Sequence, residues 1–336
     1  MHKRKYEMRY IHELIEDAGI KNILPLNGCP VRLHEKNKVN IIALGDVGTT
    51  MLTGLRLLGS DLILEIGIID LNRNNLERLE MEINQIGYPF GMKDLPPVHI
   101  VEEDELFNCD LVIFCASKGV PPVQSGYSDV RMAQLDANRE IIAHYAGLAR
   151  KAEFKGMIAV VSDPVDNLAA AFLDASGLEP WQIQGYGLGV MNKRAEYYAA
   201  KLASQGNAEA ALYKSEGRAF GPHGRDLVIA NSIEHYDDEI SRLLTDLTVD
   251  SNVRVRELGF KPYIAPAMSS AAISILLTLS GDWHYGSLYI GTGKKGAFLG
   301  VKNRLTWRGF EYEDLPLPEP LYERILEAYK RLCDIR

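Results

Sequence analysis

The sequence feature that most constrains the fold is a continuous apolar run, Val39–Leu44, that ends in a glycine turn, Gly45–Gly48. An unbroken apolar run is typical of a strand buried on both faces of a parallel sheet. The residues that follow, Thr49–Leu58, have a helical pattern. Because consecutive parallel strands need a crossover connection, this strand–turn–helix unit predicts a parallel sheet with helices on its faces.

The same alternation continues along the chain. Further strands are predicted at Leu62–Ile69, Val98–Val101, Leu111–Cys115 and Met157–Val161, and further helices at Asn72–Ile86, Val130–Lys151 and Val165–Ala175. The predicted fold is therefore α/β, with a doubly wound Rossmann-type parallel sheet over residues 39–180.

The two ends of the chain have a different character. Residues 1–38 form an N-terminal arm, in which the apolar spacing over Tyr6–Ala18 predicts a helix that packs on the body or on a neighbouring subunit. Residues 181–336 mix helical segments with shorter strand-like runs, which predicts a second, α+β domain. No Pro/Ser-rich linker separates the halves, so we expect them to share a large interface. A length of 336 residues agrees with two domains of roughly 150 residues each.

Composition excludes several classes of partner. The chain carries 37 Lys and Arg against 45 Asp and Glu, a net charge of −8, so the basic surface typical of nucleic-acid binding is absent. The segment Met1–Tyr10 is polar, and the most apolar long window is interrupted by Pro266. We therefore expect no membrane association and a cytoplasmic location. The four cysteines have no metal-ligand spacing, which favours reduced thiols and predicts no metal.

The glycine turn has the features of a dinucleotide site. Glycines there allow a tight turn and a close approach of the backbone to a pyrophosphate, and Asp70 closes the next strand about 20 residues later, where an acid binds the ribose hydroxyls. Since an acid repels a 2′-phosphate, the cofactor is expected to be NAD. Ala43 replaces the first glycine of the usual pattern, which is tolerable if its backbone angles are ordinary. The predicted cofactor residues here are Gly45, Asp46, Val47, Gly48 and Asp70. The alternative is a purely structural turn in which Asp70 caps the following helix.

Several further segments share the order and spacing of one family. They are 111–117, Arg131 with Asn138, 161–166, Gly185–Gly187 with Arg194, His223–Gly224 and 297–301. With these segments the chain resembles the lactate/malate dehydrogenase family from about Val39 to the C-terminal helix. The resemblance implies hydride transfer between NAD and a small 2-hydroxy or 2-keto acid, a second domain like that family's C-terminal domain, and a homodimer or homotetramer.

The resemblance also implies roles for single residues. His223 resembles the acid/base, Arg194 the arginine that grips the substrate carboxylate, and Arg131 the mobile-loop arginine that polarises the carbonyl. These residue types suit the chemistry, because imidazole exchanges protons near neutral pH and a guanidinium donates two parallel hydrogen bonds to a carboxylate. Residues expected on the nicotinamide side are Ala116, Ser117, Asn138 and Ser162. Without the resemblance, Arg194 is also readable as one partner of a solvated ion pair, and His223 as a turn histidine.

Three departures from the family change the expected chemistry. Met191 stands where the family has the aspartate that orients the histidine, and the neighbouring Asn192 is a neutral substitute that could accept a hydrogen bond. Asp163 stands where the family has asparagine. It either replaces the missing acid beside His223 or recognises a cationic group such as an amine or imine. Finally, the loop before Val130 lacks the second arginine of malate-specific members, which favours a lactate-like substrate.

Three functions remain open at this stage. The first is an NAD-dependent 2-hydroxy-acid dehydrogenase that uses His223, Arg131 and Asp163 as catalytic residues and Arg194, Arg131 and Asn192 as substrate-binding residues. The second is an NAD-linked reductase of imines or amino-keto acids on the same scaffold. The third is a catalytically impaired family member that binds NAD without turnover.

Overall fold

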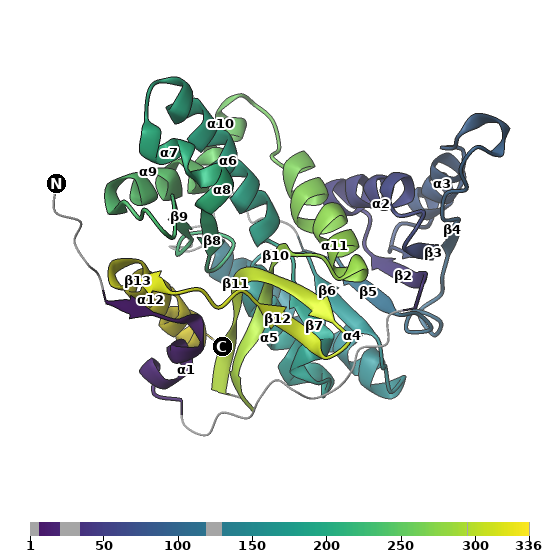
Figure 1. Ribbon diagram of the computed structural model, residues 1–336. Helices are drawn as coiled ribbons and strands as arrows, with labels where there is room; N and C mark the ends of the chain where they lie inside the picture. The colour runs from purple at the N-terminus through teal and green to yellow at the C-terminus, as the bar shows by residue number, and fades with distance from the viewer. Residues whose placement is uncertain (1–6, 21–33, 119–129, 294, 336) are drawn as a thin grey trace.

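A computed structural model describes residues 7–20, 34–118, 130–293 and 295–335; the side chains of residues 130–134, 136 and 137 are outside this description. Its centre is a nine-stranded sheet in the order β12-β11-β10-β7-β6-β5-β2-β3-β4 (Figure 1). The parallel strands are β2 (Asn37–Ile42), β3 (Ile63–Ile69), β4 (Val98–Ile100), β5 (Leu111–Phe114), β6 (Met157–Val160) and β7 (Ile183–Gly185). Their order is that of a doubly wound dinucleotide-binding sheet, which confirms the predicted fold class.

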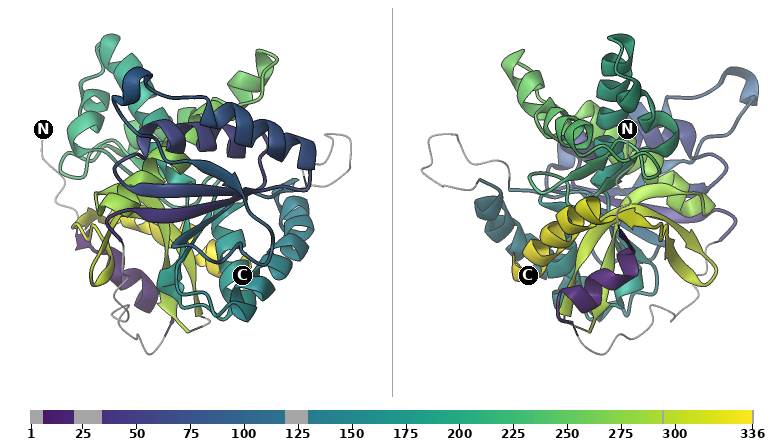
Figure 2. Two further views of the ribbon diagram at one scale, coloured as in Figure 1. Left: turned by 90° about the vertical axis from the view of Figure 1, so that its right-hand side faces the viewer. Right: turned by 60° about the vertical axis from the view of Figure 1, so that its left-hand side comes forward.

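Helices cover both faces of the parallel strands, because alternate side chains of each buried strand point to opposite faces. Ile41 and Ile113 pack in one apolar cluster with α2 (Asp46–Leu58) and α3 (Arg73–Asn84). Val112 and Phe114 pack in a second cluster with residues of α4 (Val130–Lys151) and α5 (Val165–Ser176). Figure 2 (left) shows the two layers of helices on either side of the strands.

The second half of the chain extends the same sheet. Strand β10 (His284–Thr292) pairs antiparallel with β7 at Ser287 and Gly185, and β11 (Lys295–Thr306) and β12 (Gly309–Tyr312) follow outward. Further elements of this half are α6 (Leu188–Ser204), α7 (Ala208–Ala211), α8 (Tyr213–Glu216), β8 (Arg218–Phe220), β9 (Val228–Ala230), α9 (Asp238–Val249), α10 (Ser251–Glu257), η4 (Pro266–Ile273), α11 (Ser274–Ser280) and α12 (Glu319–Ile335). Because β7 is parallel to β6 but lies beyond residue 180, the parallel sheet ends slightly later than predicted. The division of the chain into domains at that residue stays a prediction.

The described part of the N-terminal arm differs from the predicted helix. It contains a short strand, β1 (Met8–Arg9), and one helical turn, α1 (Leu14–Asp17), after a 3-10 turn. Strand β1 pairs with β13 (Leu317–Pro318), and the Tyr322 hydroxyl on α12 donates a hydrogen bond to Asp17 at 2.8 Å (Figure 1). The described part of the arm thus packs on the body of its own chain.

Among the described residues, no helix has both the length and the apolar character that a membrane crossing requires.

Candidate active site

A cavity of about 1050 Å³ opens at the carboxyl ends of the parallel strands, where the strand order reverses between β2 and β5. In doubly wound sheets, ligands bind at this position. The wall includes the glycine turn after β2, Asp70 after β3, Asp163 after β6 and His223 from the second half of the chain. Both halves therefore contribute to one site.

The glycine turn leaves room for a ligand to approach the backbone. A Cβ placed on Gly45 would meet no atom within 4 Å, whereas one on Gly48 would lie 2.2 Å from the Ala43 carbonyl oxygen. Ala43 has a φ of +69°, so its backbone is in the left-handed region, and the condition of ordinary backbone angles is not met. The tight turn imposes this conformation on a position where the family pattern has glycine, and a residue with a Cβ is strained there.

Asp70 holds the turn against the end of the neighbouring strand. One of its carboxylate oxygens accepts a hydrogen bond from the Leu44 N–H at 2.6 Å, and the other accepts one from the Asn72 N–H at 2.8 Å. The cap of helix α3 is Asn72, whose side chain accepts from the Asn75 N–H. Asp70 is therefore not the cap of this helix. Each carboxylate oxygen keeps a second lone pair, and Asp70 lines the cavity, so the residues present fit the ribose and pyrophosphate of a dinucleotide.

His223 and Asp163 form the central pair of the site. His223 Nδ1 lies 2.8 Å from Asp163 Oδ1, and the two side chains are 10% and 51% exposed. The histidine is also held by its backbone, because its N–H donates to the buried Asp166 carboxylate at 3.3 Å. A Cβ on Gly187 would lie 2.6 Å from His223 Cβ, so this glycine lets the histidine pack closely against the start of α6. Of the two predicted roles for Asp163, the geometry favours the acid beside His223.

Arg194 is a buried cation whose guanidinium contacts are neutral. It is only 8% exposed, and it donates to Asn252 Oδ1 at 2.6 Å and to Met191 Sδ at 3.5 Å. No carboxylate among the described residues is within ion-pairing distance of Arg194, and Glu196 pairs with Lys193 instead. Burial lowers the pKa of Arg194. Asn252 lines the cavity and Arg194 does not, so the guanidinium lies behind the cavity wall, next to the Asn252 side chain.

Asn192 does not face the cavity. Its side-chain oxygen accepts a hydrogen bond from the Tyr213 hydroxyl at 2.9 Å. Successive helical residues point about 100° apart, so the position next to Met191 is turned toward a different part of the core. The structure thus does not support Asn192 as a substitute acceptor for His223 or as a substrate contact.

The residues predicted on the nicotinamide side divide into two groups. Ala116 and Ser117 line the cavity. Asn138 and Ser162 instead bind the backbone just after strands. The Asn138 side chain accepts a hydrogen bond from the Lys118 N–H at 3.0 Å and donates one to the Asp163 carbonyl at 3.2 Å. The Ser162 hydroxyl donates to the Ala116 carbonyl at 2.8 Å. Both side chains hold the backbone that carries wall residues.

Arg131 lies in the first turn of α4, and its side chain is outside the described residues, as is the whole loop of residues 119–129.

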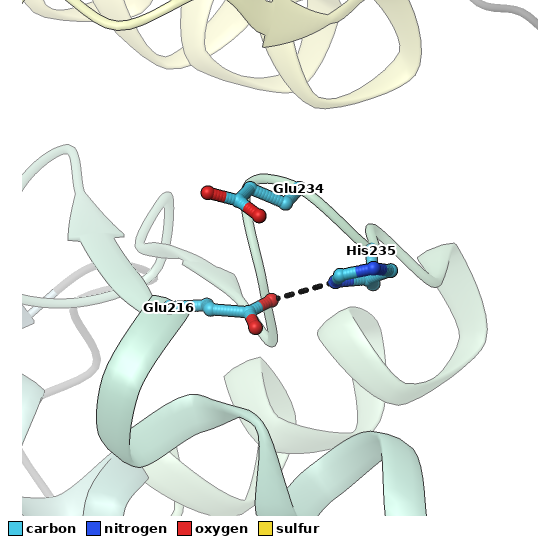
Figure 3. A group of neighbouring side chains, drawn as sticks. All are labelled: Glu216, Glu234 and His235. Carbon is cyan, nitrogen blue, oxygen red and sulfur yellow. Dashed lines mark hydrogen bonds and ion pairs between the residues drawn. The ribbon is translucent and has the colours of Figure 1, made fainter.

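One group of potential metal ligands lies away from this cavity. Glu216, Glu234 and His235 place ligand atoms within 4.8 Å of one another (Figure 3). His235 Nδ1 and Glu216 Oε2 are 2.9 Å apart, and Ser232 donates to the same carboxylate. An ion pair between Glu216 and His235 accounts for this arrangement.

Part of the chain is similar in sequence to known lactate and malate dehydrogenases. The sequence model of the NAD-binding domain of lactate/malate dehydrogenase matches residues 37–185. The chain is 28% identical over 194 residues to an L-lactate dehydrogenase of Mycoplasma pneumoniae, and 33% identical over 169 residues to one of Treponema denticola. Residues 37–185 are thus a divergent NAD-binding domain of the lactate/malate dehydrogenase type.

The aligned part of these relatives is limited. The chain spans 56% of the first relative's length and 50% of the second's. The overall fold is that of solved lactate and malate dehydrogenases. A minor L-lactate dehydrogenase from Enterococcus mundtii has a TM-score of 0.74 at 21% identity, with 90% of this chain and 98% of the other covered. A malate dehydrogenase from Picrophilus torridus has a TM-score of 0.71 at 21% identity, with 89% and 96% covered.

Two parts of the site were not predicted from the sequence: Asn252, the partner of Arg194, and the cavity residues of the segment 256–266. Asn252 is 58 residues from Arg194 along the chain, and no local pattern marks either segment. Only the packing of α9 and α10 against α6 and the cavity brings them to the site.

The strain at Ala43 gives a first prediction. A left-handed conformation costs a residue with a Cβ about 1–2 kcal/mol, and glycine's greater freedom in the unfolded chain offsets part of the gain. We expect Ala43→Gly to raise the free energy of unfolding in urea by up to about 1 kcal/mol. The control is Ala116→Gly, at the end of the neighbouring strand, which should lower it. A loss of stability in Ala43→Gly contradicts the assignment of strain.

Asp166 gives a second prediction. Burial raises the pKa of this carboxyl to about 6, above its unfolded value. Its stabilising contribution is therefore present at low pH and is lost as the pH rises through about 6. Between pH 7.5 and pH 5, the unfolding free energy of the wild type should gain about 1 kcal/mol relative to Asp166→Asn. Parallel pH profiles of the two proteins in denaturant titrations would rule out this role of Asp166.

Proposed function

We propose that the protein is an NAD-dependent oxidoreductase that transfers a hydride between the nicotinamide and a small 2-hydroxy or 2-keto acid. The observation that carries the proposal is the His223–Asp163 pair in the cavity of an NAD-binding domain. A protein that only binds NAD has no need of an oriented acid/base, whereas reduction of a keto group needs a proton donor beside the hydride acceptor.

The residues divide the chemistry as follows. Bound NAD supplies or accepts the hydride. Asp163 accepts the hydrogen bond from His223 Nδ1–H, which fixes the ring orientation and leaves Nε2 for the proton of the substrate oxygen. Arg194 attracts the substrate carboxylate from behind the cavity wall, next to Asn252. Arg131, from the start of α4, stabilises charge that develops on the carbonyl oxygen.

A lactate-like substrate is proposed over malate. Between Ser117 and Val130 the only basic residue is Lys118, which forms an ion pair with Glu140. This segment thus has no arginine that could bind the second carboxylate of malate. The relatives at 28% and 33% identity are both L-lactate dehydrogenases, which supports the same choice. A cytoplasmic location and a homodimer or homotetramer stay predictions.

The direct test is NADH oxidation against a panel of 2-keto acids, with and without ammonia, and with His223→Asn as the control. Turnover of monocarboxylic 2-keto acids that is abolished in His223→Asn supports the proposal. Turnover only in the presence of ammonia replaces it with an imine reductase. NADH binding without turnover of any substrate replaces it with a binding role.

The location of the orienting acid gives a third prediction. Asp163→Asn removes the carboxylate but keeps the shape of the side chain. Loss of an orienting carboxylate costs up to about 10⁴-fold in a serine protease triad, so we expect kcat to fall by about 10²- to 10⁴-fold while NADH affinity stays within twofold. The measurement is steady-state NADH oxidation together with a fluorescence titration.

The double variant Asp163→Asn/Met191→Asp is the matched control, because it restores the family arrangement. We expect it to recover at least part of the lost kcat. Equal activity of the wild type and Asp163→Asn would show that His223 does not depend on this acid.

A further inference from the structure

The segment of residues 256–266, between α10 and η4, reaches the cavity from the second half of the chain. Arg256, Lys261 and Tyr263 line the cavity wall together with the glycine turn. Lys261 Nζ lies 2.9 Å from Asp46 Oδ2, which joins segments 215 residues apart in the sequence. No role in the function proposed above uses this ion pair.

Asp46 places a negative charge at the turn where the pyrophosphate of a dinucleotide is expected. It is the first residue of α2, whose free N–H groups and positive dipole end attract the pyrophosphate of a dinucleotide in this fold. When no ligand is bound, a carboxylate stabilises this end of the helix, because its negative charge interacts favourably with the positive end of the dipole. With a dinucleotide present, however, two like charges meet at this turn. Asp46 thus needs a neighbouring cation if the site is to bind a pyrophosphate.

Lys261 is able to supply that cation. The side chains of Lys261 and Asp46 are 79% and 49% exposed. An ion pair this exposed contributes little free energy, so the ammonium group can exchange its contact with Asp46 for phosphate oxygens at small cost. Lysine binds phosphate as a mobile point charge and needs no fixed fork geometry.

The packing of η4 on α2 fixes the segment near the turn. A Cβ on Gly54 of α2 would lie 2.9 Å from Ala272 Cβ and 2.9 Å from Met268 Sδ, so the two helices are in direct contact at this glycine. Pro266 begins η4 five residues after Lys261. The segment that carries Lys261 therefore leads into η4, and η4 is docked on α2, the helix that begins with Asp46.

We propose that Lys261 is a cofactor-binding residue: it neutralises Asp46 and binds the pyrophosphate of the dinucleotide. The second half of the chain then contributes directly to cofactor affinity, and it selects ligands that carry a pyrophosphate.

The test compares the binding of three probes and does not depend on turnover. NADH affinity is measured by fluorescence titration, and ADP-ribose and adenosine are measured as competitors. Lys261→Met should lower the affinity for NADH and for ADP-ribose by about 5- to 10-fold. The affinity for adenosine should stay within twofold, because adenosine has no pyrophosphate. The control is Lys214→Met, which makes the same change of charge at a residue outside the cavity wall. It should leave the affinities for all three probes within twofold of the wild type.

Asp46→Asn is the second, independent variant. It removes the repelling charge and frees Lys261, so NADH and ADP-ribose should bind about 3- to 10-fold more tightly, again with adenosine unchanged. The proposal is overturned by unchanged NADH affinity in a folded Lys261→Met, by a parallel loss of adenosine binding in that variant, or by no gain for NADH in Asp46→Asn. These binding results stand even if no 2-keto acid is turned over.

Discussion

The hydrogen bond between His223 and Asp163 is the interaction on which the site depends, because it joins the two halves of the chain at the cavity. Asp163 follows β6 in the nucleotide-binding half, and His223 follows β8 in the other half. Each partner is held from behind. Asn138 binds the Asp163 carbonyl, and Asp166 binds the His223 N–H. The pair proposed to be catalytic is thus positioned by partly buried polar contacts near strand ends.

The position of the acid distinguishes this chain from the family pattern that it resembles. With methionine at position 191, the start of α6 offers the histidine no carboxylate, and Arg194 gains a thioether neighbour. The negative charge appears instead at the end of β6, half-exposed to the cavity. The buried arginine has no carboxylate within ion-pairing distance among the described residues, which favours an anionic substrate group. The same site also carries an acid at the glycine turn, Asp46, which forms an ion pair with Lys261.

Much of the fold was predictable because it follows from local patterns. Apolar runs such as Val39–Leu44 and the glycines after them predicted the parallel sheet. The pairing of Asp163 with His223 was one of two roles predicted for Asp163 from the departures at positions 163 and 191. Features set by distant partners were not predictable. The arm forms strand β1 because β13, some 300 residues later, pairs with it. Asn192 faces Tyr213 because of the helix phase, and Ala43 is left-handed because the turn closes against Gly48.

The most direct test of the central claim is the protonation site of the neutral His223 ring, read from its ¹⁵N chemical shifts in the free protein, with the signals assigned by their loss in His223→Asn. A carboxylate that accepts from Nδ1 fixes the Nδ1–H tautomer. The account predicts that this tautomer dominates in the wild type and gives way to a mixture in Asp163→Asn. A dominant Nε2–H tautomer in the wild type, or identical shifts in both proteins, would contradict it.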